Sequence, residues 1–120
     1  MANAKDSLAS AMTIDGAVGV ILADYSTGVV LGQAGGSGLN LDIAAVGTTE
    51  FLNAKMKVMA ALGLKDTIED MLITLGTQFH IIRPLVSKPG LFLYIAFDKT
   101  RANLAMARYK LTEIEAGLTL

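Results

Sequence analysis

Residues 91–97 are the segment that most constrains the fold, because they form an unbroken apolar run between Gly90 and Asp98. The run is too short for a typical helix and is bounded by turn residues, so it predicts a β-strand. Successive side chains of a strand point to opposite faces, so both faces of this strand are apolar and need cover. Residues 17–23 show the same pattern. A sheet built from such strands needs helices on both faces.

Three further segments are predicted to be extended, at residues 29–33, 68–75 and 79–86. Residues 24–28 have the length of a hairpin loop. Short turns also join the last three strands, so the five strands are expected to be mostly antiparallel. Pro84 lacks a backbone donor, so the fourth strand is expected to bulge or end near it.

Three helices complete the pattern. The first is expected over residues 4–13, and the second runs from a cap at Asn40 to residue 62, just before Gly63. Asp98 is expected to cap the last helix, which places the charges Arg101, Arg108 and Glu115 opposite an apolar stripe. The prediction is an α+β fold, a single domain over residues 1–120. Its order is helix, two strands, helix, three strands, helix, with the five-stranded antiparallel sheet flanked by helices on both faces.

Composition limits the functional classes. The chain of 120 residues has no cysteine and a single histidine, and its net charge is −1. The lack of cysteine excludes thiol chemistry and cysteine metal sites. The slightly negative charge disfavours nucleic acid as a partner. No apolar run approaches the ~18 residues of a membrane span, and the first six residues lack the apolar core of a signal peptide. We expect a cytoplasmic protein without membrane insertion. Hydrophobic residues make up 52% of the chain, so a partner is expected to cover part of its surface.

Candidate catalytic groups are few. His80 has neither a second histidine nor a cysteine to share a metal with, so a structural histidine is predicted. Asp66, Glu69 and Asp70 could be the paired carboxylates of a hydrolase. We favour the simpler interpretation that these three side chains lie in solvent at an edge of the sheet. Glycines in residues 32–38 precede a helix start and suggest an anion-binding loop, yet no P-loop Lys-Ser or Lys-Thr follows and Asp42 would repel phosphate. We predict no catalytic residue, no metal and no cofactor.

The second helix is apolar on two faces, although a helix needs only one apolar face to cover a sheet. One face carries Ala45, Thr49, Leu52, Met56 and Met59. Nearly opposite lies a second set with small residues at its centre, which suits close approach of another helix. Two outcomes stay open, burial under the domain's own first or last helix and contact with a second chain. The second set is Gly47, Phe51, Ala54, Val58, Ala61 and Leu62.

The element order, the first hairpin, the long second helix and the stretch IEDMLITLGTQFHIIRPL at residues 68–85 resemble the Roadblock / dynein light chain family in its short bacterial form. The resemblance covers nearly all of the chain. It implies one helix on one face of the sheet and two on the other. It also implies a homodimer in which the second helices pack together and the third strands pair, with Met71, Leu72 and Ile73 at the contact.

The bacterial and archaeal members of this family typically act with small Ras-like GTPases, as scaffolds or regulators of GTP hydrolysis. The resemblance therefore implies a non-catalytic homodimeric adaptor. Glu50, Lys55 and Lys57 on the second helix are the candidate contacts to such a partner. No arginine stands out as one that would enter a GTPase site, since Arg83 is expected in a strand, and Arg101 and Arg108 on the last helix. The alternatives are an anion or nucleotide sensor using the glycine loop and, third, a hydrolase using the acidic group.

Overall fold

The computed structural model describes residues 2–120 and contains the predicted elements in the predicted order. The sequence of elements is α1 (Ala4–Ala11), β1 (Ala17–Asp24), β2 (Val30–Gly35), α2 (Leu41–Ala61), β3 (Met71–Thr74), β4 (Gln78–Pro84), β5 (Leu91–Asp98) and α3 (Leu104–Gly117). The five strands form one antiparallel sheet in the order β2-β1-β5-β4-β3. The predicted fold class is confirmed.

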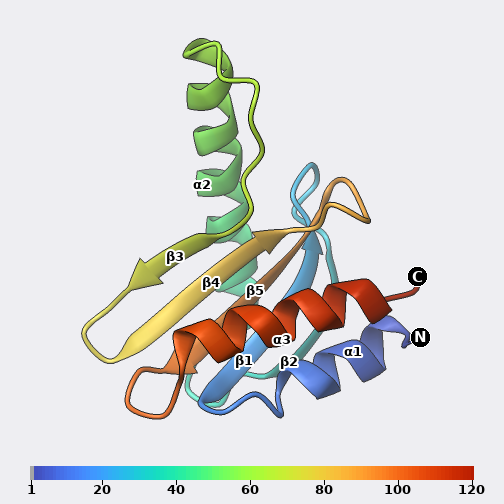
Figure 1. Cartoon of the computed structure of the whole chain (residues 1–120), viewed down its shortest axis with the longest axis vertical. Coiled ribbons are helices and arrows are strands. Elements are labelled where there is room, and N and C mark those ends of the chain that lie inside the picture. Colours follow the sequence, from blue (N-terminus) through green and yellow to red (C-terminus); the bar gives the residue numbers. More distant parts are fainter. Residues whose placement is uncertain (1) are drawn as a thin grey trace.

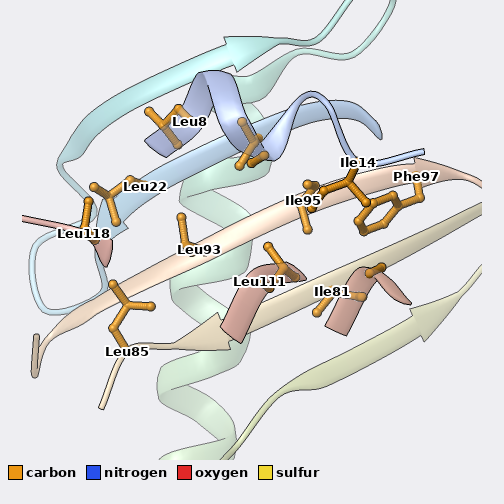
Figure 2. Packing of buried hydrophobic residues seen from close by; sticks show 13 residues of the cluster. Leu8, Ile14, Leu22, Ile81, Leu85, Leu93, Ile95, Phe97, Leu111 and Leu118 are labelled. Carbon is orange, nitrogen blue, oxygen red and sulfur yellow. The ribbon is translucent and has the colours of Figure 1, made fainter. Parts of the chain in front are cut away.

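The sheet is covered on both faces, as its apolar central strands require. Helices α1 and α3 lie together on one face and α2 lies on the other (Figure 1). The core between the sheet, α1 and α3 contains Leu8, Leu93, Ile95, Phe97 and Leu111 (Figure 2). The core under α2 contains Ile21, Leu52, Ile82 and Phe92. Alternate residues of β5 therefore enter different cores.

Each helix begins at an asparagine whose side-chain oxygen accepts a hydrogen bond from a first-turn amide. Asn40 accepts from the amide of Ile43 at 3.1 Å, as predicted for α2. Asn103, and not Asp98, caps α3, accepting from the Met106 amide at 3.0 Å. Asp98 instead closes the preceding turn by accepting from the amide and hydroxyl of Thr100. The expectation for Asp98 was wrong by five residues, because a turn separates β5 from α3.

The remaining boundaries follow local backbone chemistry. β4 ends at Pro84, as expected from its missing donor. Gly63 takes a positive φ of 70° just past α2, which closes the helix end. β3 is shorter than residues 68–75 and lies at one edge of the sheet, where an edge was predicted.

The two chain ends lie side by side (Figure 1). The amide of Ala2 donates to the carbonyl of Gly117 at 2.7 Å, and the amide of Thr119 donates to the carbonyl of Ala2 at 2.7 Å. Within residues 2–120, no helix has both the length and the apolar character that crossing a bilayer demands.

Candidate interaction surface

Helix α2 is longer than the sheet surface that supports it. Its first half is anchored by the buried residues Leu41, Ala45, Thr48 and Leu52. Its second half extends past the strands (Figure 1), and no residue after Leu52 in this helix is fully buried. The first predicted face of α2 is fully buried at Ala45 and Leu52. Met56 is half-buried against the core under α2, and Met59 is half-buried further along the helix.

The second apolar face of α2 is uncovered. Because α1 and α3 lie across the sheet from α2, neither helix covers this face, and burial under the domain's own helices is wrong. Val58 keeps 48% of its surface exposed and Leu62 keeps 65%. Of the predicted set, Gly47, Ala54, Val58, Ala61 and Leu62 are exposed and Phe51 is half-buried.

The uncovered stripe reaches further than predicted. Ile43 stands one turn before Gly47 and is 70% exposed, and the neighbouring Val46 is 56% exposed. At about 100° per residue, Ile43 shares the face of Gly47 and Phe51. The helical pattern, continued back toward the cap at Asn40, would have included Ile43 in the predicted face. We call the stripe from Ile43 to Leu62 the α2 face.

A groove of about 420 Å³ runs beside the first half of the α2 face. Phe51 lies on its helix side, while Ile73 of β3, His80 of β4 and Tyr94 of β5 contribute from the sheet. Pairing places His80 next to Ile73 on one side and Ala96 on the other. No Asp, Glu, Lys or Arg lines the groove. The α2 face and the groove therefore form one continuous, mostly apolar surface.

His80 is held between two polar partners, as a structural histidine would be. Its Nε2 lies 2.8 Å from Oε1 of Gln78, and its Nδ1 lies 3.1 Å from the hydroxyl of Tyr94. A neutral ring that donates from Nε2 and accepts at Nδ1 satisfies both contacts. Burial lowers the pKa of His80, which favours the neutral form.

The edge strand β3 adds residues to both sides of the sheet. Met71 and Ile73 pack into the core under α2, whereas Leu72 packs into the core under α1 and α3. All three are half-buried. The side chains of Met71 and Ile73 thus adjoin the α2 face. The side chain of Leu72 lies on the opposite face of the sheet, and only its backbone belongs to the same strand edge. Sequence reasoning grouped the three because it treated the strand as a single contact.

The charged residues proposed for partner contact, Glu50, Lys55 and Lys57, are all exposed on α2. None of them forms an ion pair with another residue in the described part of the chain, 2–120. Lys55 lines a shallow groove with Asp66 and Glu69. These side chains are available at the flanks of the α2 face.

Two of the three arginines are engaged within the fold. Arg83 Nε donates to Glu115 at 2.8 Å, and Arg108 donates through two nitrogens to Asp70 at 2.8 and 3.1 Å. Arg101 is exposed in the turn before α3 and not on that helix as expected. Glu115 is buried, so its expected position opposite the apolar stripe of the last helix was wrong. Asp70 is an ion-pair partner and not simply part of a solvated edge.

The glycine-rich loop before α2 uses its amides internally. Gly36 donates its amide to Val18, and Leu39 donates its amide to Gly36. The Ile43 amide is held by Asn40, and Asp42 occupies the first turn of the helix. These contacts favour a structural connection over an anion-binding loop.

Solved structures with the same fold share little sequence with this chain. Myxococcus xanthus MglB has a TM-score of 0.79 and 16% identity, covering 93% of this chain and 84% of its own. A Roadblock/LC7 domain from Streptomyces avermitilis has a TM-score of 0.80 and 11% identity, covering 96% and 93%. MglC from Myxococcus xanthus has a TM-score of 0.60 and 18% identity, covering 93% and 92%. No protein-family model and no curated protein sequence matches the chain. The likenesses show a Roadblock/LC7 fold.

Proposed function

We propose that this chain, with its Roadblock/LC7 fold, is a non-catalytic homodimeric adaptor that binds a small Ras-like GTPase. The observation that carries the proposal is the α2 face. It is an exposed apolar stripe along a helix that extends beyond the sheet it packs on. Apolar stripes of this length in soluble proteins mark contacts with other chains. A solved MglB structure is described as having a tetrameric arrangement, which supports self-association for this fold.

The homodimer buries the α2 face against its own copy. Gly47, Ala54 and Ala61 carry little or no side chain and let two helices approach closely, while Phe51, Val58 and Leu62 fill the space around them. Pairing of β3 with its copy extends the sheet across the twofold axis. Met71 and Ile73 then line the seam under the paired helices, and Leu72 lies on the opposite side of the joined sheet.

The GTPase is the partner that the Roadblock resemblance implies. Glu50, Lys55 and Lys57 are unpaired within the described chain and flank the helix pair, where a partner can reach them. Arg83 and Arg108 are held by carboxylates, and the exposed Arg101 lies in the turn before α3 and not on α2. We therefore expect any effect on hydrolysis to act by positioning the GTPase's own switch segments.

The test uses the purified chain and the small Ras-like GTPases encoded by the same genome, each loaded with GDP or with a non-hydrolysable GTP analogue. We expect one of them to bind with a preference for one nucleotide state, as measured by calorimetry. Replacing Lys55 and Lys57 together by Glu is expected to weaken that binding and leave the dimer intact. If none of these GTPases binds in either state, the adaptor proposal for this partner class fails, whatever the oligomeric state.

A further inference from the structure

His80 is the single histidine of the chain, and it lines the groove beside the α2 face. Ile43, Gly47 and Phe51 line the same groove and also belong to the α2 face. Ile73 lines it from β3, the strand that pairs with its copy in the proposed dimer. A copy that packs on the α2 face and on β3 would therefore close the groove over His80.

The open groove gives the His80 ring access to water in the single chain. His80 is half-buried, whereas the ring of Tyr94, which meets it edge to face at 5.3 Å between centroids, belongs to a residue that is only 3% exposed. A histidine in contact with water can take up a proton and stay hydrated. Removal of that water leaves the charged ring in apolar surroundings, which is unfavourable. Closing the groove therefore disfavours the protonated form of His80.

Protonation also removes a hydrogen-bond acceptor. The neutral ring donates from Nε2 to Gln78 at 2.8 Å and accepts at Nδ1 from the hydroxyl of Tyr94 at 3.1 Å. The charged ring carries hydrogen on both nitrogens, so the hydroxyl hydrogen of Tyr94 needs another acceptor. Water in the open groove can accept it. The α2 face of a copy is built of apolar side chains and offers none.

The strands around His80 supply no carboxylate to offset a positive charge. Among the groove-lining residues of the described chain, 2–120, Tyr94 is the one other titratable group. β3 contains no charged residue. On β5, Asp98 follows Ala96 on the same face of the strand. Its carboxylate is already engaged by the amide and the hydroxyl of Thr100.

Helix α2 does not supply a balancing charge either. Asp42 and Glu50 are exposed and do not line the groove. The residues of the α2 face, which a copy would lay over the groove, are all uncharged. Glu50, Lys55 and Lys57 lie on the flanks of this face and are exposed, so solvent screens them.

We propose that protonation of His80 weakens the homodimer, so that the chain is dimeric near neutral pH and dissociates in mildly acidic solution. The inference rests on the proposed homodimer and adds a regulation to it. Burial already lowers the pKa of His80 in the single chain below its ordinary value of about 6.5, and closure of the groove lowers the pKa further. The affinity is therefore complete above the single-chain pKa and falls as the pH drops toward the pKa in the dimer, by at most about tenfold per pH unit for each of the two rings.

Sedimentation of the full chain between pH 7.5 and 5.0 measures the dissociation constant of the dimer. We expect the constant to rise by at least about tenfold over this range. His80→Asn and His80→Gln place a neutral amide at the groove, and we expect their constants to change by less than about threefold, with circular dichroism verifying the fold at each pH. A constant that does not change with pH in the unaltered chain overturns the proposal. A dependence that is as steep in both variants also overturns it, because another group would then carry the effect.

A second measurement needs no variant. In a chain prepared without a histidine tag, the imidazole signals in an NMR spectrum report on His80 alone. We expect the ring to become protonated over the same pH range in which translational diffusion shows dissociation. A ring that is protonated while the dimer persists overturns the proposal. A chain that is monomeric at pH 7.5 removes the homodimer as well, whereas a dimer indifferent to pH removes only this inference.

Discussion

Glu115 shows how one side chain joins two distant parts of the fold. Its carboxylate accepts hydrogen bonds from Arg83 Nε, from the amides of Val86 and Ser87 and from the Ser87 hydroxyl, all within 3.0 Å. Burial alone would raise the pKa of Glu115, but the hydrogen bonds from Ser87 and the Arg83 ion pair outweigh it and hold the pKa below its usual value. The loop after β4 is thereby fixed to α3.

Glu115→Gln is expected to destabilise the fold by about 1–3 kcal/mol, because an amide cannot accept all four hydrogen bonds and leaves partly buried donors without their partner. Urea unfolding measures the change. Glu113→Gln on the exposed side of α3 is the control and should change stability by less than about 0.5 kcal/mol. Equal effects of the two substitutions would show that the Glu115 contacts contribute little.

His80 makes the stability depend on pH. Burial lowers its folded-state pKa, so the unfolded chain, with a histidine pKa of ~6.5, binds the proton more readily. The stabilisation is therefore complete above about pH 6.5 and is lost as the pH falls toward the folded pKa, by at most about 1.4 kcal/mol per pH unit.

The variant His80→Asn tests this dependence, since its amide oxygen can replace Nδ1 as the acceptor for Tyr94. Unfolding free energies between pH 7.5 and 5.5 should fall more steeply for the unaltered protein than for the variant. Parallel curves would mean that His80 has the same proton affinity in the folded and unfolded states.

Among the elements, α2 provides the sharpest test of the proposed dimer. Val58→Glu would bury a carboxylate next to its own copy, at a cost of several kcal/mol per dimer. We expect dissociation, or aggregation of the exposed apolar stripe, and loss of GTPase binding. Lys57→Glu, one residue away at the polar flank, should leave the dimer intact. Light scattering decides the matter, and a stable Val58→Glu dimer would mean that the contact uses another surface.

The edge strand β3 gives an independent test. The amide of Leu75 donates to Gln78, so Ile73 and Met71 also bond to β4 in the alternating ladder, and Leu72 points its amide outward. Of the three residues expected at the dimer contact, Met71, Leu72 and Ile73, only Leu72 therefore has an amide that reports on pairing with a copy. We expect its exchange to be slow in the dimer and fast in Val58→Glu. Fast exchange at Leu72 in the intact dimer would show an open edge.

At the scale of the whole molecule, the parts predictable from sequence were those set by short-range periodicity. Both apolar faces of residues 91–97 required helices on each side of the sheet, and the cap at Asn40 with the stop at Gly63 placed α2 closely. The errors came from long-range contacts. Glu115 has the sequence pattern of a surface charge. Its burial depends on Arg83 and residues 86–87, which belong to a separate strand and loop and contact it only in the folded chain.

The candidate interaction surface was predictable only where it follows a short-range pattern. The apolar stripe on α2 follows from a helical repeat, so its members were identified except at the N-terminal end, where Ile43 was missed. The groove floor was not predictable, because His80, Ile73 and Tyr94 come together only when three strands pair in register.

Because the two chain ends lie next to each other, the chain can be circularly permuted, which changes the order of its elements along the sequence. A short linker from Thr119 to Ala2 would replace hydrogen bonds that already hold the ends together, and the exposed residues 63–66 offer a place to open the chain. Such a circular permutant would begin with β3 and finish with α2. The unsupported half of the helix then becomes a free terminus that can be shortened turn by turn while the sheet stays whole. The helix length that the proposed self-association needs then becomes a measurable quantity.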